Sequence, residues 1–302
     1  CIRDSDNEDV AYVTQTTFNG NIATGDGYGG GLFNDIGDTL DVSFSTVTNN
    51  NALTNGGGID NEGTITSQFN TITGNTPNQT VGVASTTGTT YIVTDPTDKT
   101  TGNTLRHAII LANANAGDNT IEFNFASSTT ISLTLGALVI NPATAGDGLN
   151  IINIGAGAVT IDATGNGPNA NNVNALGVAA PNTSSGRIFE ILSTSGNVQI
   201  SGQSAPITLT RASSNSTNGP ASGDGGAIYD DTAEALDISN VVFTSNSAYY
   251  YGGAVYADSG LVYVTGSSFG TSSGNGNTAV NDYGGAIYYD GVKSLTVVNS
   301  SF

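Results

Sequence analysis

The chain has 302 residues, only 10% of them charged, and a formal net charge of −19. Its six Lys and Arg residues are too few to neutralise a phosphate backbone or an anionic lipid surface, which excludes nucleic-acid binding and electrostatic membrane docking. A single Cys excludes an internal disulfide framework, and 37% hydrophobic residues with 41 Gly indicate short strands and turns rather than disorder.

Residues 1–80 contain a repeat that begins with consecutive glycines. Two copies, GGGL and GGGI, start at Gly29 and Gly56. A second motif ending in Asn recurs in the same frame, as FNGN at 18–21, VTNN at 47–50 and ITGN at 72–75. Regular recurrence of short motifs at this spacing predicts a solenoid.

Residues 81–88 break the repeat and predict a linker, followed by a strand at 91–95 and a helix at 104–115. Asn103 or Thr104 can cap this helix. Its apolar positions recur at helical spacing on one face, formed by Leu105, Ala108, Ile109 and Ala112. A strand resumes at 120–123, and Arg106 is expected to bond loop carbonyls or a carboxylate beside the helix.

Apolar strands then continue at intervals that suit further coils. We predict them at 131–135, 149–154, 158–161, 188–192, 198–200 and 207–209. The polar stretches 166–185 and 213–222 predict long outward loops.

The glycine repeat returns over 223–302. Its copies read GGAI, GGAV and GGAI and start at Gly225, Gly252 and Gly284. The second motif is FTSN at 243–246, which stands in the same frame relative to Gly225 as VTNN does relative to Gly29.

Each repeat supplies short apolar strands that cannot bury a face alone, whereas stacked coils pair every strand with its equivalent about 4.8 Å away. We therefore predict an all-β fold, a right-handed parallel β-helix with one short capping helix. The expected inward rungs are Leu40, Val42 and Val47, and Leu236, Ile238, Val241 and Phe243. The glycines are expected at tight corners, and the motif Asn residues in side-chain ladders or Asx turns.

The paired tetrapeptides GGA[I/V] and FxxN resemble the polymorphic outer membrane protein repeat. In this chain they read GGAI at 225–228, FTSN at 243–246, GGAV at 252–255 and FNGN at 18–21. The resemblance covers 1–80 and 223–302 and implies a bacterial surface β-helix of the kind found in autotransporter adhesins.

The segment GNTLRHAI at 102–109 resembles the CSLREA domain, without its Cys and with His107 in place of Glu. That resemblance implies an N-terminal cap over 89–125. We expect 1–80 to be the end of a first β-helix block and 89–302 a second block opened by this cap. The alternative is that the helix is an insertion in one continuous solenoid.

The repeat frame predicts that the chain begins and ends within a repeat, as an internal stretch of a longer solenoid truncated at its C-terminus. Cys1 then falls just after a missing glycine pair and is expected to be a small corner residue. A lipid-bearing N-terminal cysteine is the alternative interpretation.

An acidic residue lies six positions after each repeat start. These residues are Asp35, Glu62, Asp231, Asp258 and Asp290. In stacked coils Asp231, Asp258 and Asp290 form a column. Solvated corner turns explain such a column, a weak Ca²⁺ ladder is a second interpretation, and the carboxylate pair of a carbohydrate-active enzyme is a third.

Tyr229, Tyr256 and Tyr288 lie four positions after their repeat starts. Each follows an inward Ile or Val and is expected to face outward. The rings either stack for stability or offer a strip for sugars or proteins. His107, the only His, lies on the predicted helix beside Arg106, which disfavours a catalytic role.

We therefore predict a non-catalytic extracellular or cell-surface β-helix shaft, structural or adhesive, that can self-assemble into a fibre or sheath. A carbohydrate-active β-helix enzyme of the pectin lyase or hydrolase kind is the alternative. No cofactor is expected apart from the Ca²⁺ ladder. Expected partners are other copies of the chain, other surface proteins, or glycans.

Overall fold

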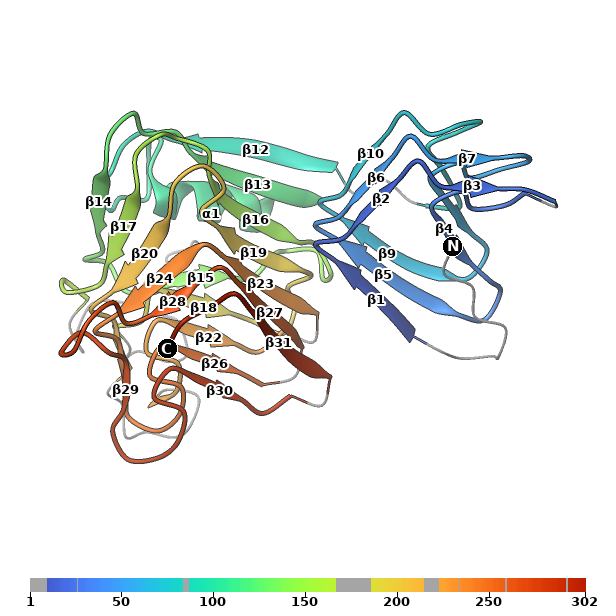
Figure 1. Ribbon diagram of the computed structural model, residues 1–302. Helices are drawn as coiled ribbons and strands as arrows, with labels where there is room; N and C mark the ends of the chain where they lie inside the picture. Colours follow the sequence, from blue (N-terminus) through green and yellow to red (C-terminus); the bar gives the residue numbers. More distant parts are fainter. Residues whose placement is uncertain are drawn as a thin grey trace. The chain divides into compact units, whose positions relative to one another are not determined.

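A computed structural model of the protein describes residues 10–25, 27–83, 87–166, 186–214, 223–232, 234–258, 260–291 and 293–302 (Figure 1). Cys1 and most of the two predicted loops, residues 167–185 and 215–222, lie outside the described residues. The chain forms two compact units, Cys1–Thr87 and Gly88–Phe302.

The first unit consists of stacked coils whose strands pair in parallel. Among its described residues there are three three-stranded sheets and one two-stranded sheet. The sheets are β1 (Val10–Thr14), β5 (Thr39–Ser43) and β9 (Thr64–Gln68); β2 (Thr17–Asn19), β6 (Thr46–Thr48) and β10 (Thr71–Thr73); β4 (Leu32–Asn34), β8 (Ile59–Asn61) and β11 (Thr80–Val81); and β3 (Ile22–Ala23) with β7 (Asn51–Ala52).

The second unit opens with β12 (Thr87–Val93) and α1 (Leu105–Ala114), which precede further stacked coils (Figure 1). Where it is described, this unit has one seven-stranded, two five-stranded and one three-stranded sheet. The seven-stranded sheet contains β12, β13 (Asp118–Phe123), β16 (Leu149–Asn153), β19 (Val198–Ser201), β23 (Ala235–Ser239), β27 (Leu261–Thr265) and β31 (Ser294–Val298).

The other sheets of the second unit stack in the same order. One is β14 (Thr129–Ser132), β17 (Val159–Asp162), β20 (Ile207–Thr210), β24 (Val241–Thr244) and β28 (Ser268–Phe269). The next is β15 (Leu138–Ile140), β18 (Phe189–Ile191), β22 (Ile228–Asp230), β26 (Val255–Ala257) and β30 (Ile287–Tyr289). The small one is β21 (Ser213–Ser214), β25 (Ser247–Ala248) and β29 (Thr278–Ala279). The predicted parallel β-helix is confirmed, and each strand expected between 131 and 209 is present with slightly shifted ends.

Side chains along each strand alternate between the coil interior and the outer face, and the inward ones form the core. All four residues of the predicted rung in the second unit are fully buried, and those of the first unit are at most 3% exposed. Because parallel pairing keeps equivalent residues opposite one another, Ile238 lies between Ile200 and Val264 and the apolar rungs form a continuous interior.

The two positions of each glycine pair require glycine for different steric reasons. The first glycine has positive φ, +61° at Gly225 and +65° at Gly252, which L side chains rarely adopt. The second lies against the next coil: a Cβ on Gly226 would be 2.0 Å from the carbonyl oxygen of Gly253. The predicted tight corners are confirmed.

The motif Asn residues form the predicted side-chain ladders. In the first unit, Asn21 Nδ2 donates to Asn50 Oδ1 at 2.8 Å and Asn50 Nδ2 donates to Asn75 Oδ1 at 3.0 Å. In the second unit, Asn246 Nδ2 donates to Asn277 Oδ1 at 2.9 Å. These amides satisfy the buried polar groups where the backbone turns.

Helix α1 covers the N-terminal end of the second unit. Thr104 caps it, because its side chain accepts a hydrogen bond from the backbone N–H of His107. The predicted apolar face is buried in the same core cluster as the first coil. The helix therefore removes from water a rung that would otherwise lie open.

Candidate functional site

The outer face of the sheet β15–β18–β22–β26–β30 carries the predicted tyrosine column. Glu190, Tyr229, Tyr256 and Tyr288 are successive partners across this sheet. The rings of Tyr229 and Tyr256 stack at 5.3 Å and those of Tyr256 and Tyr288 at 5.7 Å, both nearly parallel. The predicted stack is present, because in-register strands hold equivalent rings at stacking distance.

Two of these outward-facing rings are nevertheless buried. Tyr229 is only 9% exposed and Tyr256 only 8%, whereas Tyr288 is partly exposed. Strand alternation shows that a side chain leaves the coil interior, but neighbouring coils and loops decide whether it reaches water. Burial raises the pKa of Tyr229 to about 12.

Arg187 starts the column and was not singled out in the sequence. Its side chain is fully buried, with the guanidinium carbon 4.7 Å from the centre of the Tyr229 ring. Its Nε donates to the carbonyl oxygen of Asp224 at 2.9 Å, and Nη1 lies 3.9 Å from Glu190 Oε1. The column thus already holds one cation on an aromatic face.

The predicted acidic column follows the ends of β22, β26 and β30. Asp231 and Asp258 are half-buried and Asp290 is exposed. Burial, and then the charge of Asp258, raises the pKa of Asp231. In the part of the chain that the structure describes, no three His, Cys, Asp or Glu side chains are grouped as a metal site requires. The Ca²⁺ ladder stays a prediction.

Two buried acids beside this column were not predicted from the sequence. Asp230 points into the coil and is fully buried, and burial raises its pKa to about 8. Asp224 is 1% exposed, its Oδ1 accepts a hydrogen bond from Tyr251 N, and burial raises its pKa to about 6. The sequence signal for Asp230 was its position two residues after inward Ile228, on the same face of the strand.

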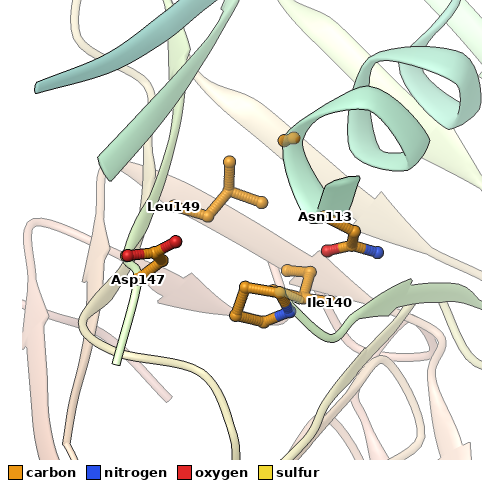
Figure 2. Close-up of a pocket in the computed structure, with 7 residues that line it drawn as sticks. Asn113, Ile140, Asp147 and Leu149 are labelled. Carbon is orange, nitrogen blue, oxygen red and sulfur yellow. The ribbon is translucent and has the colours of Figure 1, made fainter. Parts of the chain in front are cut away.

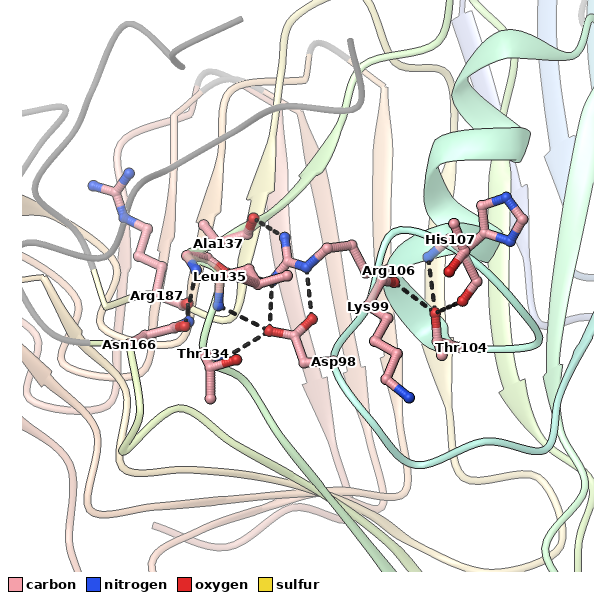
Figure 3. Close-up of polar contacts among 12 residues, drawn as sticks. Asp98, Lys99, Thr104, Arg106, His107, Thr134, Leu135, Ala137, Asn166 and Arg187 are labelled. Atoms are coloured by element: carbon pink, nitrogen blue, oxygen red, sulfur yellow. Dashed lines mark hydrogen bonds and ion pairs between the residues drawn. The ribbon is translucent and has the colours of Figure 1, made fainter. Parts of the chain in front are cut away.

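Arg106 forms the polar centre of the cap (Figure 3). Its Nε donates to Asp98 Oδ1 at 2.6 Å, and its two terminal nitrogens donate to the carbonyl oxygens of Ala137 and Gly136 at 3.1 and 2.6 Å. The predicted contacts with a carboxylate and loop carbonyls are confirmed. His107 Nδ1 lies 2.6 Å from the carbonyl oxygen of Gly102, a contact within the capping segment.

Figure 2 shows a small hollow between the C-terminal end of α1 and the first coil. It has room for about one water molecule. Its walls are Ala112, Asn113, Ile140, Pro142, Asp147, Gly148 and Leu149. The hollow is therefore a packing feature of the cap rather than a substrate site.

The stacked parallel coils, Asn ladders and glycine corners define a parallel β-helix repeat protein. Residues 240–258, which hold FTSN, GGAV, Tyr256 and Asp258, match the model of the Chlamydia polymorphic membrane protein repeat. This match confirms the predicted resemblance, and the repeat indicates a bacterial surface or outer membrane protein. Searches of curated proteins and of solved structures gave no significant match. Among the described residues, no helix is long and apolar enough to cross a membrane.

Proposed function

We propose that this protein is a non-catalytic shaft displayed on a bacterial surface, where its outer faces and loops make adhesive contacts. The observation that carries the proposal is the matched repeat at 240–258, since this repeat is typical of surface proteins. The filled coil interior supports it, because a packed solenoid is a rigid body that can hold contact residues away from the cell.

The test displays the chain through a fused anchor on a bacterium that does not adhere by itself. Attachment to cells and to solid surfaces is expected to rise, together with aggregation between bacteria if copies of the chain bind one another. The control is Leu236→Asp with Ile238→Asp, which places charges in a fully buried rung and breaks the fold. Equal attachment by the folded and broken chains would overturn the proposal.

A catalytic role is tested on the purified chain with acidic and neutral polysaccharides. No reducing or unsaturated ends are expected. Their release by the native chain, and its loss in Asp258→Asn, would replace the shaft with a carbohydrate-active enzyme. Electron microscopy of concentrated protein tests fibre formation separately.

A further inference from the structure

Two outward loops beside the tyrosine column bring further tyrosines together. We define the tyrosine cluster as Tyr249, Tyr250, Tyr251, Tyr283 and Tyr288. The first three follow β25, and Tyr283 follows β29. The rings of Tyr249 and Tyr250 meet edge to face at 4.7 Å, whereas Tyr251 lies 4.5 Å from Tyr288 and 6.2 Å from Tyr283.

Backbone hydrogen bonds between the loops hold the main chain that carries these rings. Asn281 N donates to Tyr249 O at 3.0 Å, and Gly252 N donates to Tyr283 O at 3.1 Å. Tyr250 N donates to Gly223 O at 3.1 Å in the preceding coil. A partner would therefore meet a surface that is already arranged, with little ordering cost on this side.

The rings of the cluster lie in a negative field. Tyr283 is 69% exposed, and the other four side chains are partly exposed. The pKa of Tyr251 is raised, and the largest cause is the charge of Asp282. The charge of Asp224 raises it further. Asp282 itself is exposed. Electron-rich ring faces next to carboxylates attract cations rather than anions.

Arg187 shows the chemistry that this aromatic surface accepts. Its guanidinium lies over Tyr229, which stacks through Tyr256 on Tyr288 of the cluster. A cation of the chain itself thus covers Tyr229, and the cluster presents more rings and a carboxylate at Asp282. Planar guanidinium groups stack on aromatic faces better than ammonium groups do.

We propose that the tyrosine cluster binds arginine side chains of a positively charged partner protein. This inference rests on the proposed adhesive function and names the chemistry of one partner. The net charge of −19 favours such an encounter over long range, and the cluster supplies the specific contact.

The test measures binding of a hexa-arginine peptide to the full chain by calorimetry and by tyrosine fluorescence, which no Trp obscures. We expect binding that weakens with added salt and is absent for the neutral citrulline analogue. Tyr283→Leu and Tyr250→Leu should each raise the Kd for the peptide by about 2- to 5-fold. Asp282→Asn should raise this Kd too.

Matched controls change the same chemistry elsewhere. Tyr28→Leu removes another exposed ring, and Glu62→Gln removes another exposed charge, both in the first unit. Neither control should change the Kd for the peptide by more than a small fraction of the change caused by the cluster variants. Equal weakening by the controls, or unchanged binding in the cluster variants, would overturn the inference in favour of attraction by net charge alone.

The outcomes separate this inference from the proposed function. Cluster variants that keep full surface attachment but lose the peptide leave the inference standing and place adhesion elsewhere. A native chain that raises attachment but does not bind the peptide overturns only the inference. Cluster variants that lose a neutral oligosaccharide instead of the peptide also overturn it and name a sugar as the occupant.

Discussion

The side chain of Asp230 is buried in the coil interior. Its neighbours across the sheet are Ile191 and Ala257, and Thr232 N donates to its Oδ1 at 3.1 Å. The equivalent position in the repeats of the first unit holds Asn34 and Asn61. A neutral amide suits a buried site, whereas a carboxylate must keep its proton there.

Replacing Asp230 by Asn should therefore remove a pH dependence of stability. Burial raises the folded-state pKa from 3.8 to about 8, so the stabilisation by the bound proton is complete below pH 4 and is lost as pH rises to 8. The loss is at most about 1.4 kcal/mol per pH unit. Denaturant titrations from pH 4 to 9 should show a flatter profile for Asp230→Asn and an unchanged one for exposed Asp290→Asn.

The Asn ladder supports a second prediction at this scale. Asn50 is fully buried, accepts from Asn21 N at 2.9 Å and donates to Phe18 O at 3.0 Å. Asn50→Ala leaves these partners unsatisfied and should cost about 1–3 kcal/mol in the free energy of unfolding. Exposed Asn51→Ala should change it by less than about 0.5 kcal/mol. Similar costs for both would show that the ladder contributes little.

The cap is held by a buried ion pair that joins three segments. Arg106 comes from α1, Asp98 from the preceding loop, and Asp98 Oδ2 accepts from Thr134 N and Leu135 N at 2.6 and 2.9 Å, after β14. Both side chains are at most 5% exposed. Such a pair fixes geometry strongly, because removing one partner strands the other charge.

Arg106→Met should destabilise the second unit by about 3–5 kcal/mol. Arg106→Lys should cost less, because it keeps the charge but loses the forked contacts with Asp98 and the two carbonyls. Hydrogen exchange of the α1 amides should speed up more than exchange in β23, which lies further along the sheet. Unchanged exchange in α1 would contradict the role of this pair.

At the scale of the whole molecule, carboxyl groups with a raised pKa have a larger effect on the pH dependence of stability than carboxyl groups with a lowered pKa. Burial raises the pKa of Asp224 to about 6 and of Asp230 to about 8, and it also raises that of Asp231. Hydrogen bonding with Arg211 lowers the pKa of Asp162 to about 2, so its stabilisation holds above pH 3.8 and is lost as pH falls through 2.

The melting temperature should therefore be highest near pH 4, where unfolded carboxyls begin to ionise while the buried ones keep their protons. It should fall toward pH 8 as the buried acids ionise, and fall again below pH 4 as Asp162 is protonated. Scanning calorimetry across this range checks the profile. A maximum above pH 7 would mean that the buried acids do not dominate.

The coil architecture was predictable because its determinants are local and repeated. Inward Leu236 and Ile238 follow from alternation, the corner at Gly225 from its glycine pair, and the ladder at Asn246 from its recurrence. The burial of Tyr256 was not predictable, since alternation distinguishes the inside of a coil from the outside but not an open outer face from a covered one.

The sequence alone determined the stacked coils, the cap helix with Arg106 at its polar contacts, and the surface-protein repeat. Only the tertiary structure decided that Arg187 lies over Tyr229 and that Asp230 is buried. Each of those environments is built from strands and loops far apart in the sequence, so their burial depends on the stacking of coils. The periodicity that predicts a strand carries no information about what the neighbouring coil places above it.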